Sequence, residues 1–309
     1  MIFLEPIRKR LLIVGILLVV VTKAISIPEQ TQMFVFFAVL AITGVPHGSL
    51  DFFIEKKIII HSNKLIFKLN FIFKYLINML AYGILWYFFP SFAFILFIGL
   101  TAYHFGEIDW QIHQKKYLDR WLYSLFGLLL IVFIIVSHID YAAPVLAVLL
   151  PKFINQALWI KIGNSFTLPI ACILLAYLLT LVCWLPKIGY NKNKVYSFAF
   201  QAVILIVVIY SLPFYLSFAF YFGCWHSLIS FNLIRNQLEF ANTYKGWLEL
   251  IKKAIPYTVL AWTGIVFFIL FTSKFQNNDL IISNIFIGIS ILTLPHLQVF
   301  TKIVSLKKQ

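Results

Sequence analysis

Long apolar runs, each broken by a short polar, charged or proline-containing segment, follow one another along most of the chain. A helix needs about 20 apolar residues to cross the hydrocarbon core of a bilayer. Because proline ends helices, we expect tight hairpins at Pro90 and Pro213. The pattern predicts about ten transmembrane helices, at roughly 11–27, 33–54, 71–89, 91–106, 120–138, 166–185, 196–212, 214–234, 254–272 and 280–300.

The apolar stretch at 141–150 is too short to span a membrane and ends at Pro151. We therefore interpret 141–161 as a re-entrant or interfacial segment. No internal repeat, linker or low-complexity tract interrupts the rest of the pattern. The expected fold is an all-α, polytopic integral membrane helix bundle that forms a single domain over residues 1–309.

Composition excludes the main alternatives to a membrane protein. Of the 309 residues, 62% are hydrophobic and 12% are charged, whereas a soluble domain carries about 25% charged residues. The three cysteines all lie in apolar stretches and lack the spacing of a metal site. A water-soluble globule, a disordered chain and a disulfide scaffold are therefore excluded.

The positive charges predict an orientation for these helices. Lysine and arginine number 25 against 11 acidic residues, which in a membrane protein is a topology signal and gives no reason to expect a nucleic-acid partner. With the N-terminus in the cytoplasm, 21 of the 25 basic residues fall in inside segments. We expect a multi-pass protein of the cell inner membrane with both termini cytoplasmic. The span at 11–27 also resembles a signal peptide, but we favour a retained helix.

The seven histidines fall into two groups. His61 and His113 lie in predicted cytoplasmic loops, and His138 stands beside Asp140 at the outer end of a span, where we expect an interfacial hydrogen bond. The other four lie inside predicted spans, about 12–16 residues from the outer end and so roughly 18–24 Å deep. Ionisable groups at such a depth are unfavourable and tend to be functional. These four are His47, His104, His226 and His296.

Four imidazoles in one layer, each from a different helix, suit a metal ion, because imidazole is a common ligand of iron, copper and zinc. The same number would also suit two bis-histidine haems in an electron carrier. A third reading is a proton-coupled transporter, in which intramembrane His and Asp residues relay protons. Pro46 and Pro295 each precede a histidine and can aim its ring inward through a kink. Gly48 and Gly106 permit close helix packing beside two of the rings.

Three carboxylates lie close in sequence to these histidines. Asp51 follows His47 by four residues, and Glu107 and Asp109 come three and five residues after the next histidine. A metal-bound histidine usually donates its other N–H to a carboxylate or carbonyl group, which fixes the ring. We expect the carboxylates to support the ligands, Asp51 through a histidine of another helix; the alternative is that Glu107 and Asp109 are ordinary interfacial charges. Four neighbouring aromatic residues are candidates for lining a slot for a flat conjugated molecule: Tyr103, Phe105, Phe222 and Trp225.

Four short motifs together resemble the Brp/Blh family of bacterial and archaeal β-carotene 15,15′-dioxygenases, which are related to the bacteriorhodopsin-related protein. The resemblance extends from about residue 40 to residue 300 and implies an iron-dependent membrane enzyme, with His47, His104, His226 and His296 as ligands of Fe(2+). One position departs from the family, because Ser230 stands where many members have a second histidine. The motifs are Pro46-His47-Gly48-x-x-Asp51, His104-Phe105-Gly106-x-x-Asp109, Trp225-His226-Ser227 and Pro295-His296.

By this resemblance, the reaction is cleavage of the central double bond of β-carotene by dioxygen. The products are two retinal molecules, which a rhodopsin could receive. Dioxygen supplies both aldehyde oxygens, so no other oxidant is needed. The protein has to hold the polyene straight, place its middle bond at the iron and exclude water. A substrate dissolved in the lipid bilayer can enter sideways between helices.

Overall fold

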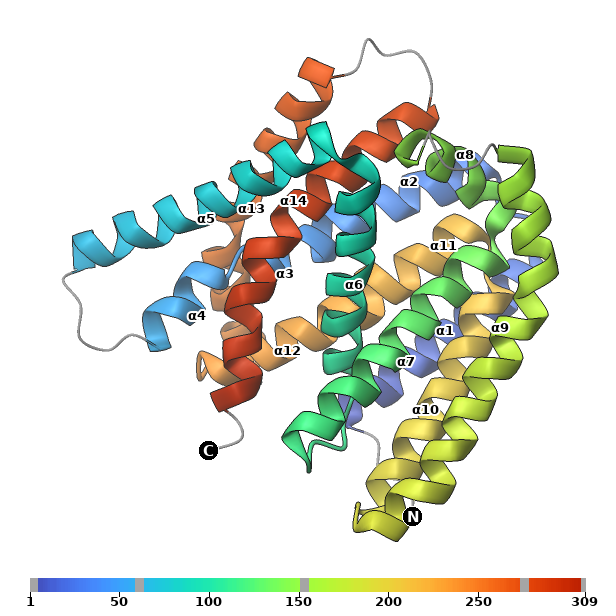
Figure 1. The fold of residues 1–309 in the computed structure, drawn as a ribbon. Coiled ribbons are helices and arrows are strands. Elements are labelled where there is room, and N and C mark those ends of the chain that lie inside the picture. The colour runs from blue at the N-terminus through green and yellow to red at the C-terminus, as the bar shows by residue number, and fades with distance from the viewer. Residues whose placement is uncertain (1–4, 59–63, 151–155, 273–277, 307–309) are drawn as a thin grey trace. The chain divides into compact units, whose positions relative to one another are not determined.

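The structure is a computed structural model that describes residues 5–58, 64–150, 156–272 and 278–306. Within these ranges every regular element is helical (Figure 1). Eight helical segments are long and apolar enough to cross a membrane, which confirms the predicted all-α membrane bundle. They are Glu29–Lys57, Phe67–Phe88, Pro90–Asp109, Tyr117–Ser137, Gln156–Ile188, Lys192–Ser211, Tyr244–Leu270 and Ile282–Lys302.

Two of the ten predicted spans are not among these eight. The first, at 11–27, corresponds to α1 (Pro6–Ala24), a 19-residue helix with basic residues near both ends. The second, at 214–234, consists of three shorter pieces: α11 (Phe214–Phe218), the π-helix η3 (Ala219–His226) and α12 (Ser227–Gln237). A count of apolar residues predicts neither the effect of the basic residues in α1 nor the division of 214–234 into three helical pieces.

The segment predicted to be re-entrant contains α8 (Ile139–Leu149), whose 11 residues are too few to span a bilayer. Residues 151–155 of that segment lie outside the described part of the chain. α9 (Gln156–Trp184) then begins ten residues before the predicted start at 166. Its first turns contain Lys161 and Asn164, which break the apolar run without preventing a helix.

Both predicted proline hairpins are present. α5 (Lys64–Phe88) is followed by α6 (Pro90–Asp109), so one residue joins them. α10 (Lys192–Ser211) is followed by α11 after two residues, the second of which is Pro213. Proline suits the start of a helix because its missing N–H would have no partner there.

The chain forms two compact units, each built from separate stretches of sequence. The first unit comprises Met1–Leu40, Thr101–Ala147 and Phe153–Ile229. The second comprises Ala41–Leu100, Val148–Lys152 and Ser230–Gln309. Boundaries fall inside four described helices, which therefore contribute to both units: η1 (Leu40–Gly44), α6, α8 and α12. The expectation of a single domain over 1–309 stays a prediction.

In the first unit, α7 (Lys116–Ser137) and α10 both pack against α9 (Figure 1, green to yellow). α1 packs against α10 and η3, and α2 (Glu29–Val39) packs against α11 and η3. The short 3₁₀ helix η2 (Leu185–Ile188) joins α9 to α10. α6 and α7 approach so closely that a Cβ added at Gly106 would overlap the carbonyl oxygen of Tyr123.

In the second unit, α14 (Asn278–Leu306) lies beside α5 and also contacts α13 (Tyr244–Thr272) (Figure 1). The π-helix η1 (Leu40–Gly44) leads into α3 (Val45–Gly48) and α4 (Asp51–Ile58), and both of these short helices pack against α14. The predicted span at 33–54 is therefore not one straight helix. Its π-helix ends two residues before Pro46, which cannot donate a backbone hydrogen bond.

Candidate metal centre

The second unit holds a pair of buried histidines, His47 on α3 and His296 on α14. Their ring centres lie 5.0 Å apart and the ring planes meet at 81°. His47 comes three residues after the π-helix η1, and its Nδ1 lies 3.4 Å from the carbonyl oxygen of Thr43, one turn earlier. His296 follows Pro295 within a continuous helix.

Asp51 holds one of these two rings directly. Its Oδ1 lies 2.8 Å from His296 Nδ1, and the two residues are 245 positions apart in the sequence. Tyr75 donates its hydroxyl to the other carboxylate oxygen at 3.2 Å. When His296 donates its Nδ1–H to Asp51, its Nε2 carries the lone pair, which is the arrangement found in carboxylate–histidine–metal sites. Asp51 thus reaches a histidine of another helix, as its position in the sequence suggested.

The first unit holds the other pair, His104 on α6 and His226 at the end of η3. Their ring centres lie 4.9 Å apart with planes at 75°. Both side chains are buried. The ring of Phe105 is centred 4.1 Å from that of His226, and Phe222 stacks on the same ring at 6.0 Å. Packing by aromatic rings therefore limits how His226 can turn.

Glu107 is buried beside this pair. Its Oε1 accepts hydrogen bonds from the hydroxyls of Tyr103 at 3.4 Å and Tyr123 at 3.3 Å. Asp109 is buried too, and its two oxygens accept bonds from Trp225 Nε1 at 2.7 Å and the Tyr221 hydroxyl at 3.1 Å. The reading of Glu107 and Asp109 as ordinary interfacial charges is therefore wrong.

The four aromatic residues that are candidates for lining a slot also make contacts around the histidines and carboxylates. Phe105 and Trp225 are buried, the first against His226 and the second in a hydrogen bond to Asp109. Tyr103 binds Glu107, and Phe222 is half-buried. Among the described residues, Phe105 packs on a histidine ring, and Trp225 and Tyr103 donate hydrogen bonds to the neighbouring carboxylates.

The remaining histidines do not belong to either pair. His138 Nε2 lies 2.9 Å from the carbonyl oxygen of Leu212, which confirms the expected hydrogen bond at the end of its span. His113 is exposed and has a φ of 29°. His61 lies outside the described residues. Ser230, the position at which the chain departs from the family pattern, is fully buried.

Sequence reasoning missed Arg8, whose guanidinium is buried and lies 3.9 Å from Asp109. In the sequence Arg8 is one of three adjacent basic residues, which indicate only the orientation of the helix. A clue was available, because Arg8 shares one helix face with Leu11, Leu12 and Gly15, at the spacing of a buried stripe. The two π-helices were missed as well, and no residue pattern in the chain signals them.

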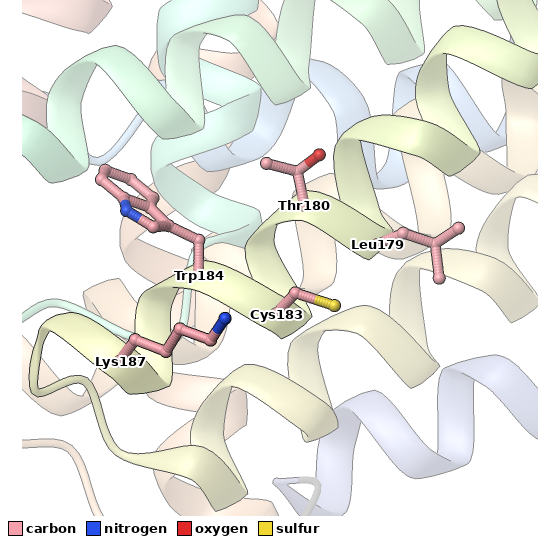
Figure 2. Close-up of a pocket in the computed structure, with 5 residues that line it drawn as sticks. All are labelled: Leu179, Thr180, Cys183, Trp184 and Lys187. Atoms are coloured by element: carbon pink, nitrogen blue, oxygen red, sulfur yellow. The ribbon is translucent and has the colours of Figure 1, made fainter.

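An open pocket of about 340 Å³ lies on a different part of the first unit. The side chains that line the pocket belong to α9, except for that of Lys187, which belongs to η2 (Figure 2). None of the predicted site residues lines it. The lining residues are Leu179, Thr180, Cys183, Trp184 and Lys187.

Comparison with known proteins is consistent with the motifs. The family model described as β-carotene 15,15′-dioxygenase matches residues 12–303. A protein of an uncultured marine bacterium (66A03), named β-carotene 15,15′-dioxygenase, is 27% identical over 271 residues, which cover 84% of this chain and 90% of the relative. No solved structure matches the chain significantly. Because the family model covers nearly the whole chain, the protein belongs to the β-carotene 15,15′-dioxygenase family.

Proposed function

We propose that this protein cleaves the central double bond of β-carotene with dioxygen to give two retinal molecules. We further propose that His47, His104, His226 and His296 together bind one Fe(II). Membership of the family supports the reaction. The observation that carries the metal proposal is that each unit holds two buried imidazoles whose ring centres are 5.0 and 4.9 Å apart.

This spacing fits two ligands at adjacent positions of one ion. With a metal–nitrogen bond of about 2.1 Å and about 1.1 Å from the nitrogen to the ring centre, each ring centre lies about 3.2 Å from the metal. Two ligands at about 90–110° then have ring centres about 4.5–5.2 Å apart, and two opposite ligands about 6.4 Å apart. The spacing within each pair supports adjacent ligands and disfavours a haem between the rings.

The chemistry of the donor set supports iron. Four neutral imidazoles suit a divalent transition metal and leave coordination positions for dioxygen. When bound, iron would supply activation of dioxygen. The protein's own residues hold and orient the donors: Asp51 fixes His296, and the aromatic rings around His226 restrict its rotation.

The overall reaction balances without another reactant. The carbon–carbon double bond and the dioxygen bond both break, and two aldehyde carbon–oxygen double bonds form. No side chain has to act as a nucleophile, and no proton is gained or lost. The remaining tasks are to align the polyene and exclude water, and buried apolar side chains such as Phe105 serve the second. We propose that the carotenoid enters from the lipid bilayer and that a rhodopsin can receive the retinal.

The proposal includes an orientation in the cell inner membrane, with both termini in the cytoplasm. Its support is the distribution of basic residues, 21 of 25 of which fall in the proposed inside segments. Reporter fusions test it. A fusion within 238–243 should report the cytoplasm, and an external signal there would overturn the orientation.

The reaction is tested by expressing the chain in bacteria that accumulate β-carotene and measuring pigment loss and retinal by chromatography. We expect retinal as the product, and a longer or shorter apocarotenal would overturn cleavage at the central bond. The controls are His113→Ala and His61→Ala, which should form retinal as the wild type does. If His61→Ala were as damaging as His104→Ala, the choice of the four histidines would be wrong.

A further inference from the structure

A polar cluster around Asp109 contains none of the four proposed metal ligands. Asp109 is the last residue of α6, and its side chain is almost fully buried. Trp225 and Tyr221, both on the π-helix η3, donate to its two oxygens at 2.7 and 3.1 Å. One carboxylate therefore joins the end of the helix that carries His104 to the π-helix that ends at His226.

Arg8 of α1 completes the cluster. Its Nη1 lies 3.9 Å from Asp109 Oδ1, and its Nη2 donates to the carbonyl oxygen of Ile108 at 2.6 Å. The guanidinium also lies over the ring of Trp225, 5.8 Å from its centre. The Arg8 and Asp109 side chains are only 4% and 2% exposed. Removing one partner of such a buried pair leaves the other charge uncompensated, so the two are expected to act together.

Two members of the cluster, Tyr221 and Trp225, lie on the π-helix η3. π-Helical turns are rare and short and occur often at functional sites, so their hydrogen-bond pattern needs support from other parts of the structure. Here Tyr221 and Trp225, one turn apart on η3, bind the same carboxylate. Because Trp225 directly precedes His226, fixing the indole also fixes the direction in which the imidazole points.

We infer that Arg8 and Asp109 are positioning residues that hold η3 in register against α6 and thereby set the spacing of His104 and His226. The inference rests on the proposed function, since it takes the two imidazoles as metal ligands. It also gives α1 a role in the site through Arg8, which in the sequence is only one of three adjacent basic residues.

The test is metal retention by purified protein in detergent, measured with Co(II) in place of iron. The variant is Arg8→Gln, and the matched control is Arg10→Gln, which removes an exposed charge from the same helix. Loss of support for a ligand typically lowers affinity about 10- to 100-fold. We expect Arg8→Gln to lose Co(II) to a chelator about 10-fold faster or more and to shift the Co(II) absorption bands. Arg8→Lys should recover part of the loss, and Arg10→Gln should match the wild type.

Trp225→Phe is a second, milder variant that decides the question if Arg8→Gln does not fold. It removes the donor to Asp109 and is expected to shift the same bands. Its control is Trp110→Phe, a change at a buried tryptophan whose indole nitrogen has no hydrogen-bond partner among the described residues.

Two results would overturn the inference, and they differ. A folded Arg8→Gln or Trp225→Phe protein with wild-type bands and a wild-type rate of metal loss overturns the positioning role alone. A wild-type protein that binds neither Co(II) nor Fe(II) overturns the proposed metal centre, and the positioning role with it.

Discussion

The two histidine pairs have almost the same ring spacing, but the protein supports them in different ways. In the second unit, Asp51 binds His296 directly at 2.8 Å. In the first unit, the carboxylate of Asp109 binds Trp225 and Tyr221, neighbours of His226, and aromatic rings pack on the imidazole itself. The ring of His296 is fixed by a hydrogen bond, and the ring of His226 is fixed through η3, the backbone segment that carries it.

Under the proposed set of ligands, a carboxylate that lies near a ligand in the sequence therefore supports the site in more than one way. Direct support depends on one hydrogen bond and is sensitive to loss of the carboxylate charge. Support through a π-helix depends on several contacts that act together. The effects of two substitutions among these contacts are therefore not expected to add.

The largest expected effect is loss of a ligand, and it should be equal in the two pairs. His296→Ala and His104→Ala should each reduce retinal below detection and lower iron well below one atom per chain, because both pairs are proposed to bind the same ion. Iron content by elemental analysis and retinal by chromatography measure this. If His104→Ala kept half of the wild-type iron, the pairs would bind separate ions, and the proposal of one centre would be wrong.

The next largest effect contrasts two glycines. Gly106→Ala places a methyl group on the carbonyl oxygen of Tyr123, whereas a Cβ at Gly48 would lie 3.5 Å from His296 Nδ1, an ordinary contact. Overpacking typically costs about 1–3 kcal/mol, and a clash with rigid backbone is expected to reach the upper end. Thermal unfolding in detergent should show a clear loss for Gly106→Ala and little change for Gly48→Ala. Equal stability of the two variants would contradict the close approach of α6 and α7.

Changes at Asp51 should have an intermediate effect. Asp51→Asn keeps the shape and some hydrogen bonding, so we expect it to retain iron and to turn over about 10- to 100-fold more slowly. Asp51→Ala should be worse and should lose iron more readily to a chelator. Wild-type turnover in Asp51→Ala would remove the carboxylate from the site. Complete loss of iron already in Asp51→Asn would make Asp51 a ligand itself.

The smallest effect is expected one hydrogen bond further from the proposed metal. Tyr75→Phe removes the hydroxyl that donates to Asp51 at 3.2 Å, and a single hydrogen bond of about 0.5–1.5 kcal/mol corresponds to roughly a 2- to 10-fold change. Turnover measured beside Asp51→Asn gives the comparison. An effect of Tyr75→Phe larger than that of Asp51→Asn would mean that Tyr75 has a separate role.

Much of the fold could be predicted because membrane helices are long and strongly apolar. The hairpins at Pro90 and Pro213 followed from local backbone chemistry. The matched depth of the four histidines in the membrane, obtained by counting residues, stays a prediction. The buried state of Glu107 and Asp109 did not follow, because burial of a carboxylate near the membrane surface depends on partners from distant helices. Arg8 shows the same limit, since its partner Asp109 lies about a hundred residues away.

The π-helices η1 and η3 could not be predicted from composition or spacing. A π-turn differs from an α-turn by one residue in its hydrogen-bond pattern, and contacts such as those of Tyr221 and Trp225 with Asp109 decide between the two. These contacts are part of the tertiary structure. The sequence therefore predicts which residues make up the candidate site more readily than the backbone that positions them.

The separation of 245 positions between Asp51 and His296 also determines when the proposed site can be completed during synthesis. The pair of His104 and His226 is available once η3 has left the ribosome, whereas His47 cannot pair with His296 until α14 has been translated and inserted. Under the proposed set of ligands, a nascent chain that ends in α13 can offer a metal only three of its four imidazoles. If the four histidines bind one metal as we propose, metal loading is a late step of biogenesis that follows insertion of the last helix, and chains aborted before α14 should be inactive.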